Sequence, residues 1–218
     1  MGIPVSEALR NLGAAGAGED LRRLAEDVAG ELERKVHPRF VWKSFRIRRE
    51  PGEVVLPEAG IRLPGRLAEN VLAECDTAVL LACTLGAVFD ALLLATEARD
   101  MARASVLDAC GSAWTEAVCD EAEQEIARRF PVLYRTDRFS PGYGDLPLSL
   151  QPDIVSALNA GKTLGITVNA SFLLTPAKSV TAILGLSEKP QGARIRGCAF
   201  CALQGSCAYR ERGTFCGV

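Results

Sequence analysis

The stretch from Met101 to Phe130 is the feature that most constrains the fold, because apolar residues recur along it at helical spacing. The predicted helix carries two adjacent apolar rows rather than one, so its buried face is broad. Other parts of the chain must cover that face. The first row is Val106, Cys110, Ala113 and Ala117, and the second is Leu107, Trp114, Val118, Ala122 and Ile126.

A polar row lies opposite the apolar rows, formed by Asp108, Ser112, Glu116, Asp120 and Glu123. Like charges four residues apart cost an exposed helix roughly a few tenths of a kcal/mol, which applies to Glu116 and Asp120. The row is therefore either a solvated acidic face or a face that a cation contacts. Taken by itself, the helix favours the solvated face.

The remaining elements are short. Helices are predicted at Ser6–Leu12, Asp20–Val36, Pro64–Ala73 and Gln151–Ala160, the last stopped by Gly161, and strands at Phe40–Ile47, Val54–Leu56, Ile61–Leu63, Thr77–Cys83, Ile166–Leu174 and Ser179–Gly185. No internal repeat or low-complexity linker separates them. We expect residues 1–190 to form one α+β domain, with residues 1–63 as a subregion, and residues 191–218 to form a cysteine-rich tail.

Charge and hydropathy exclude several classes of function. The net charge of −2, from 25 basic and 27 acidic residues, gives no overall attraction for nucleic acid. Basic residues concentrate between Lys35 and Arg49, which we interpret as one solvated strand face, with nucleic-acid binding as the minor alternative. The apolar runs are too short to cross a bilayer, and the first residues lack the order of a signal peptide. We therefore expect a cytoplasmic protein without nucleic-acid or membrane partners.

Four of the eight cysteines crowd together in the tail with the spacing C-x2-C-x5-C-x8-C. Reduced cytosolic thiols in such a cluster are typical of metal binding, and four thiolates complete one coordination shell. The single C-x2-C pair favours a [4Fe–4S] cluster over zinc, which remains the alternative. The predicted ligands are Cys198, Cys201, Cys207 and Cys216, whereas Cys75, Cys83, Cys110 and Cys119 are interpreted as small core residues.

The sequence RFSPGYGD, from Arg138 to Asp145, is the most unusual stretch without cysteine. Pro141 and Gly142 force a turn, Tyr143 offers a hydroxyl on a stacking ring, and Arg138 offers a planar fork that suits a carboxylate. Such a loop suits an amino-acid-like ligand, although many loops of this composition are only ordered turns.

The order of motifs after Arg138 resembles the reactivation domain of cobalamin-dependent methionine synthase. R-x-S-P-G-Y, a short helix and LGITVNASFLLTPAKSVTAILG correspond to that family's R-x-A-P-G-Y-P turn, helix and strand pair. The likeness is strongest over Arg138–Gly185 and extends more faintly through Glu116 to Thr84–Gly86. The chain departs from the family at Gly144, where the family has proline, and at DLPLSLQ, which replaces CPDHTEK.

This resemblance implies an antiparallel twisted sheet packed with helices and a site for S-adenosylmethionine. Arg138 would bind the methionine carboxylate, and the backbone of Ser140 would lie along the ligand. Gly142 and Tyr143 would line the pocket, and Glu116 would supply an acidic group. Lys178 is either a further contact to ligand or corrinoid or, as is commoner at a strand start, a solvated residue.

The resemblance also implies a role as the activation component of a methyltransferase, supporting reductive methylation of cob(II)alamin. The chain has no corrinoid-binding D-x-H-x-x-G pattern, and its one histidine, His37, is not assigned as a cobalt ligand. Cobalamin would therefore arrive on a partner, a corrinoid-binding methionine synthase or a related corrinoid methyltransferase. An electron would come from the cysteine cluster or from a donor such as flavodoxin or ferredoxin.

A second hypothesis is a non-catalytic module that docks on a corrinoid protein and uses zinc to brace its tail. An ordinary S-adenosylmethionine-dependent methyltransferase is disfavoured because no glycine-rich strand-loop-helix opening is present. The tail also lacks the C-x3-C-x2-C spacing of radical S-adenosylmethionine enzymes.

Overall fold

The computed structural model describes residues 2–14, 16–192 and 205. Its helices are α1 (Val5–Asn11), α2 (Glu19–Lys35), α3 (Arg66–Val71), α4 (Ala87–Glu97), α5 (Met101–Arg129), α6 (Gln151–Leu158) and α7 (Ala160–Leu164). Its strands are β1 (Arg39–Arg46), β2 (Arg48–Glu50), β3 (Glu53–Leu56), β4 (Ile61–Pro64), β5 (Thr77–Thr84), β6 (Tyr134–Arg135), β7 (Thr167–Val168), β8 (Leu174–Thr175) and β9 (Ser179–Ser187). The expected combination of helices with antiparallel sheet is confirmed.

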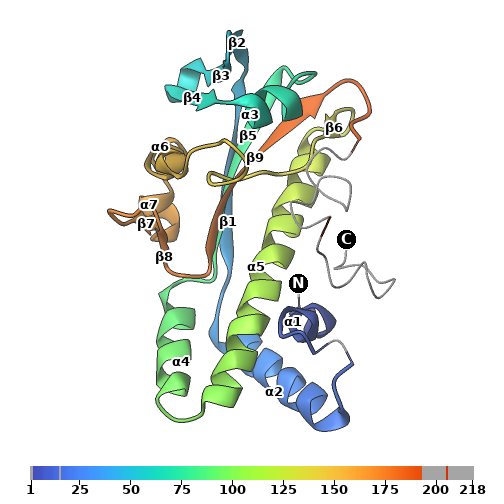
Figure 1. Ribbon diagram of the computed structural model, residues 1–218, viewed down its shortest axis with the longest axis vertical. Coiled ribbons are helices and arrows are strands. Elements are labelled where there is room, and N and C mark those ends of the chain that lie inside the picture. The colour runs from blue at the N-terminus through green and yellow to red at the C-terminus, as the bar shows by residue number, and fades with distance from the viewer. Residues whose placement is uncertain (1, 15, 193–204, 206–218) are drawn as a thin grey trace. The chain divides into compact units, whose positions relative to one another are not determined.

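The strands form a four-stranded sheet with the order β1-β5-β9-β6, a three-stranded sheet β2-β3-β4 and a two-stranded sheet β7-β8 (Figure 1). The chain divides into two compact units, and the division falls within β1, β5 and β9. Unit 1 contains Met1–Lys43, Leu80–Arg129 and Leu148–Thr181, and unit 2 contains Ser44–Val79, Phe130–Pro147 and Ala182–Val218. No helix in the part of the chain described is long and apolar enough to cross a membrane.

Unit 1 is built on α5, which α1, α2 and α4 contact (Figure 1). Every residue of the two predicted apolar rows of α5 is buried, so the broad face is confirmed. Gly111 lies on the same face, and the buried ring of Phe89 from α4 occupies the place where a side chain at Gly111 would be. The missing side chain thus permits the close approach of α4 to α5.

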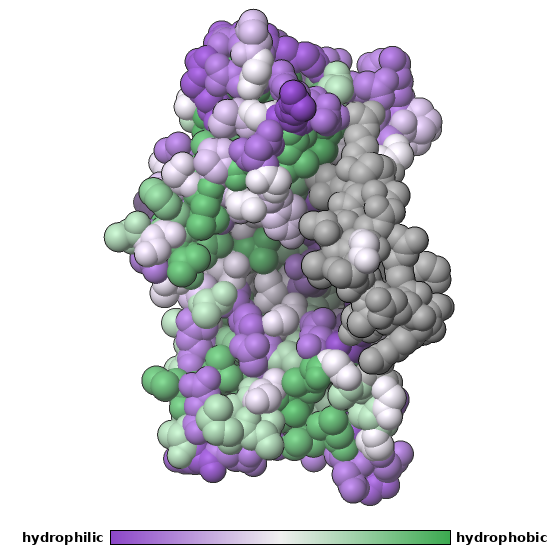
Figure 2. Space-filling model, in the orientation of Figure 1, coloured by the Kyte–Doolittle hydropathy of each residue, from purple (hydrophilic) through white to green (hydrophobic). Residues whose placement is uncertain are grey.

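Helix α4 presents an apolar surface. Of its 11 residues, all of which the structure describes, Phe89 alone is buried. Val88 and Leu94 are 53% and 69% exposed, and Figure 2 shows apolar surface in this region of unit 1. The sequence did not predict this helix.

Unit 2 contains the antiparallel sheet β2-β3-β4, whose strands pair in register at Val55 with Arg48 and at Val54 with Leu63. The buried side chains of β3 and β4 pack beneath α3, the helix that follows β4 directly. In the same unit, β6 pairs antiparallel with the end of β9.

The basic residues of β1 and β2 are exposed, as the sequence indicated, and two of those in β1 also bind the ends of helices. In unit 1, Arg39 donates to the carbonyl oxygens of Thr163 and Leu164, at 3.1 and 3.0 Å, and Lys43 donates to that of Ala157 at 2.7 Å. These carbonyls belong to the last turns of α7 and α6, where backbone acceptors have no partner within the helix. The basic side chains therefore cap two helix C-termini, which favour positive charge.

The strand predicted at Ile166–Leu174 is wrong, because the segment folds into a tight hairpin of β7 and β8. The side chain of Asn169 accepts the backbone N–H groups of Ser171 and Leu173, at 2.9 and 3.0 Å. Phe172 takes a left-handed conformation with φ 61°. Local side-chain hydrogen bonding of this kind competes with a continuous strand, and the apolar run gave no sign of it.

The predicted stop of the Gln151–Ala160 helix is also displaced. Helix α6 ends at Leu158, and Asn159 is left-handed with φ 56°. Gly161 lies inside the next helix, α7, which is stopped by Gly165 with φ 75°. Asn159 therefore provides the stop that the sequence had assigned to glycine, in keeping with the tolerance of asparagine for this conformation.

The four cysteines outside the tail, Cys75, Cys83, Cys110 and Cys119, are buried free thiols, as predicted. The four predicted metal ligands, Cys198, Cys201, Cys207 and Cys216, lie outside the residues described. The domain boundary at residue 190 and the metal site stay predictions.

The contact between Phe89 and Gly111 gives a stability prediction. Gly111→Ala improves helix propensity, but its new methyl group overlaps the buried ring, so we expect the free energy of unfolding to fall by about 1–3 kcal/mol. Gly30→Ala in α2 is the matched control, because a side chain there meets only the flexible end of Arg34 at 3.4 Å. It should raise stability by up to about 1 kcal/mol. Urea denaturation of both variants measures the difference. An unchanged free energy of unfolding for Gly111→Ala would contradict the close contact between Phe89 and Gly111.

Candidate functional site

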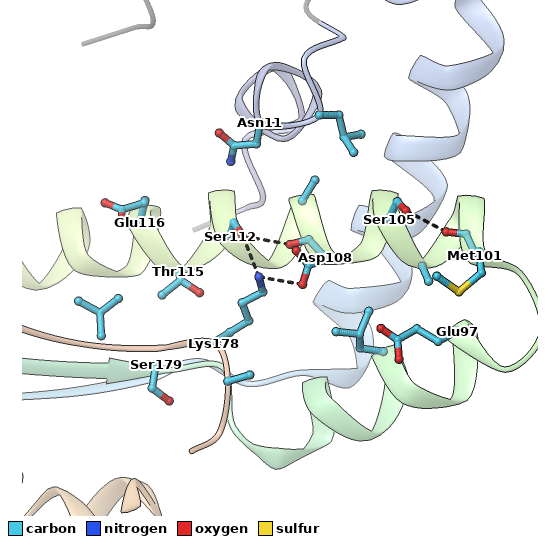
Figure 3. Close-up of a pocket in the computed structure, with 16 residues that line it drawn as sticks. Asn11, Glu97, Met101, Ser105, Asp108, Ser112, Thr115, Glu116, Lys178 and Ser179 are labelled. Carbon is cyan, nitrogen blue, oxygen red and sulfur yellow. Dashed lines mark hydrogen bonds and ion pairs between the residues drawn. The ribbon is translucent and has the colours of Figure 1, made fainter. Parts of the chain in front are cut away.

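A cavity of about 860 Å³ lies in unit 1 along the polar row of α5 (Figure 3). Residues from Met101 to Glu116 of α5 form one wall, and α4 contributes Leu93 and Glu97. The end of α1 and the segment from Ala177 to Val180, at the start of β9, complete the lining. Three residues of the polar row, Asp108, Ser112 and Glu116, therefore line a cavity.

A cation does contact this row, and it is Lys178. Its ammonium nitrogen lies 2.8 Å from Oδ1 of Asp108 and donates to Oγ of Ser112 at 2.8 Å (Figure 3). The lysine side chain is 17% exposed and that of Asp108 is 49% exposed. Lys178 is thus held across the cavity against α5, which decides against the reading of a solvated lysine at a strand start.

The backbone on either side of Lys178 is anchored within unit 1. Its carbonyl accepts the N–H of Leu85 at 2.9 Å, and the N–H of Ala177 donates to Oδ2 of Asp90 at 2.9 Å. The hydroxyls of Thr84 and Ser179 are 2.7 Å apart. These contacts hold the residues at the start of β9 against the end of β5 and the start of α4. The side chain of Lys178 is thereby directed toward α5.

The hydroxyl groups of α5 in the cavity are partly used within the helix. Ser105, Ser112 and Thr115 each donate to the carbonyl four residues earlier, at 2.9, 3.2 and 2.8 Å. The oxygen of Ser112 also accepts a hydrogen bond, from Lys178 at 2.8 Å. The exposed carboxylates of Glu116 and Glu97 add further acceptors to the lining of the cavity.

The loop from Arg138 to Asp145 lies in unit 2 and is closed by its own backbone. Gly142 donates to Leu146 at 2.8 Å, and Tyr143 donates to Ser140 at 3.0 Å. Phe139, fully buried, exchanges two backbone hydrogen bonds with Ile183 of β9, at 2.9 and 2.7 Å. The predicted turn is thus a rigid loop tied to β9.

Burial divides the side chains of this loop. Arg138 is buried, with 8% exposure, whereas the ring of Tyr143 is 51% exposed. Gly142, with φ 93°, is exposed beside it. The exposed surface of the loop therefore includes the peptide at Gly142 and the ring of Tyr143, whereas Arg138 is buried.

Asp145, the last residue of the loop, caps α3. Its carboxylate accepts the backbone N–H groups of Arg66 and Leu67, at 2.7 and 3.0 Å. Gly65, with φ 96°, precedes the helix, and a side chain there would lie 2.6 Å from the carboxyl carbon of Asp145. The N–H of Leu67, then that of Arg66, holds the pKa of Asp145 below its usual range.

The predicted ligand residues are divided between the units. Arg138, Ser140, Gly142 and Tyr143 share one loop of unit 2, while Glu116 lines the cavity of unit 1. Sequence reasoning missed the cap formed by Asp145 and the contacts of Lys178 with Asp108 and Ser112. The signal for the latter was present in the polar row, which called for a cation without identifying it.

Comparisons with known proteins bear on the fold. No family model matches the chain, and no curated protein matches it. Among solved structures, the crystal structure of the MetH reactivation domain bound to AdoHcy is similar, with a TM-score of 0.63 and 18% identity. The match covers 90% of this chain and 74% of that one. At this identity the likeness shows a shared fold, and this chain is a distant structural relative of that domain.

The cap formed by Asp145 gives a pH prediction. Because the folded-state pKa is lowered, its stabilising contribution is full above the unfolded pKa of about 4 and is lost as the pH falls through the folded pKa. Asp145→Asn should therefore be less stable than wild type at pH 7, and the difference should shrink below about pH 4. Measuring the free energy of unfolding of both proteins from about pH 2 to about pH 7 tests this difference.

Asp76→Asn is the control for this titration, since Asp76 is a 94% exposed aspartate of the same unit, 3.8 Å from Arg49. It should change stability little at any pH, because exposed ion pairs contribute little. A difference for Asp145→Asn that stayed constant through the acid range would contradict the assigned cap.

Proposed function

We propose that this chain binds S-adenosylmethionine and serves as a reactivation component for a separate corrinoid methyltransferase. The observation that carries the proposal is the fold, which is similar over 90% of the chain to a reactivation domain solved with AdoHcy, S-adenosylhomocysteine, the demethylated product of that ligand. The R-x-S-P-G-Y motif supports it, because this motif forms an ordered loop with an exposed face.

In this proposal the loop of unit 2 recognises the amino-acid part of the ligand. The guanidinium of Arg138 pairs with the carboxylate, and the peptide from Ser140 to Gly142 lies along the chain of the ligand. The ring of Tyr143 covers it, using an apolar face that is exposed in the structure. Glu116, in the cavity of unit 1, is proposed separately as an acidic group, because its carboxylate would favour the positive charge of a sulfonium.

The role of the protein is positional, because transfer of a methyl group from a sulfonium needs no acid or base from the protein. Cob(II)alamin on the partner would take up one electron and then the methyl group, which regenerates methylcobalamin. We expect the partner to be a corrinoid-binding methionine synthase or a related methyltransferase, with a flavodoxin or ferredoxin as a possible electron donor. The chain would act as one component of a methyltransferase.

The proposed metal ligands are Cys198, Cys201, Cys207 and Cys216, which offer four thiolates, a donor set that fits either a [4Fe–4S] cluster or zinc. A cluster would supply single electrons, whereas zinc would only brace the tail. A non-catalytic docking module with structural zinc is therefore the alternative to the electron-delivering form of this proposal.

Ligand binding is tested by calorimetry with S-adenosylmethionine. Tyr143→Ala should weaken binding about tenfold, because an exposed ring that covers a ligand contributes on the order of 1–2 kcal/mol. Arg138→Gln should weaken it further, by about 2–3 kcal/mol, since a charge-assisted contact to carboxylate is lost. The matched control is Tyr134→Ala, which removes a tyrosine of similar exposure, 48%, in the same unit.

Wild-type protein without affinity for S-adenosylmethionine, alone and with a corrinoid partner, would refute the proposal. Equal affinities of the Tyr143→Ala and Tyr134→Ala variants would instead show that the loop is not part of the ligand site. The ligand would then bind elsewhere on the chain. Circular dichroism of Arg138→Gln separates lost binding from lost folding, since Arg138 is buried.

The metal is tested by anaerobic purification, with measurement of iron, sulfide, zinc and the visible spectrum. A [4Fe–4S] cluster predicts about four iron and four sulfide per chain and a brown absorbance that dithionite bleaches. Colourless protein with one zinc per chain would support the docking module. Cys201→Ser should abolish the bound metal in either case, whereas Cys110→Ser, at a buried thiol of α5, should retain it.

A further inference from the structure

Two buried thiols of unit 1 face each other across the boundary between sheet and helix. Cys83 lies in β5 and Cys119 in α5, and neither side chain has any exposed surface. Their sulfur atoms are 3.1 Å apart, although the residues are 36 positions apart along the chain. Cys83 also donates to the carbonyl of Thr115 at 3.9 Å.

The other two buried thiols of the described residues, Cys110 and Cys75, lie elsewhere. Cys110 lies on the same helix but donates to the carbonyl of Ala25 at 3.9 Å, and burial raises the pKa of its thiol to about 11. Cys75 packs against Gly185 in unit 2. A disulfide needs sulfur atoms about 2.05 Å apart, so Cys83 and Cys119 require an approach of about 1 Å.

We propose that Cys83 and Cys119 are a redox-sensitive pair, which a small peroxide converts to a disulfide that ties β5 to α5. One thiol reacts with hydrogen peroxide, whose O–O bond breaks to give a sulfenic acid and water. The second sulfur attacks the sulfenic sulfur, and the displaced hydroxide leaves as water with the thiol proton. Two thiols and one peroxide thus yield one disulfide and two waters, and a dithiol reductant reverses the change.

Burial decides which oxidant reaches the pair. A bulky disulfide such as oxidised glutathione cannot approach sulfur atoms without exposed surface, whereas hydrogen peroxide is small enough to enter during local opening of the structure. In a reducing compartment, disulfides of this kind are transient and redox-sensing rather than structural.

The disulfide would affect the cavity of unit 1. Thr115, one turn before Cys119, lines the cavity, and its carbonyl accepts from Cys83. A bond between the two sulfur atoms fixes this part of α5 to β5 and closes a long loop that includes α4. The proposal does not depend on the proposed function, because its test detects the disulfide and not the binding of a ligand.

Peptide mapping tests the pair directly. In the full-length variant Cys75→Ala/Cys110→Ala, trypsin leaves one cysteine in each of the peptides 67–99 and 104–128. After peroxide treatment and alkylation under denaturing conditions, mass spectrometry should find these two peptides linked, and dithiothreitol should separate them. Adding Cys119→Ala to the same variant is the matched control, in which the linked species must disappear.

Thermal unfolding provides the second measurement on wild-type protein. Closing this loop should raise Tm on the order of 5–10 °C after peroxide, with reversal by dithiothreitol, and Cys83→Ala should remove the rise. The proposal is overturned if both peptides keep fully alkylated thiols while the cysteines of residues 198–216 are oxidised. Linkage of Cys83 to a different cysteine overturns it as well.

Discussion

The close contact between the ring of Phe89 and the backbone of α5 at Gly111 sets the geometry of unit 1. Because this position of α5 lacks a side chain, α4 approaches closely enough for its single buried residue to anchor it. The position of α4 in turn fixes Asp90, which holds the backbone of Ala177 and so the lysine that follows. The polar wall that α5 contributes to the cavity therefore depends on the apolar contact that another face of α5 makes with Phe89.

Periodicity predicted the two longest helices, α2 and α5, because burial of a stripe follows directly from spacing, but it missed α4, in which only Phe89 is buried. Both apolar rows of α5 are buried, and the free cysteines among them are core residues as expected. Prediction failed where single side chains redirect the backbone. Asn169 turns an apolar run into a hairpin, and Asn159 ends α6 before the glycine that had been given that role. Hydrogen bonds of this local kind leave no trace in hydrophobic spacing.

The contacts of the candidate sites were harder to predict because they join residues far apart in sequence. The polar row of α5 called for a cation, but only the fold shows that Lys178 supplies it, reaching Asp108 from the start of β9. In the same way, the basic residues of β1 indicated a solvated face, and their carbonyl partners on α6 and α7 emerge only from packing. The sequence identified Asp145 only as the last residue of a loop, whereas its carboxylate caps the N-terminus of α3.

These caps bear on how the loop of unit 2 would meet a ligand. Phe139 holds its first residues to β9, and Asp145 holds its last residue to the N-terminus of α3. Between these points the backbone closes on itself through Gly142 and Tyr143, so little ordering entropy remains to be lost on binding. The exposed ring of Tyr143 is therefore presented on a fixed support, because the backbone N–H groups of α3 hold the ionised carboxylate of Asp145 and with it the end of the loop.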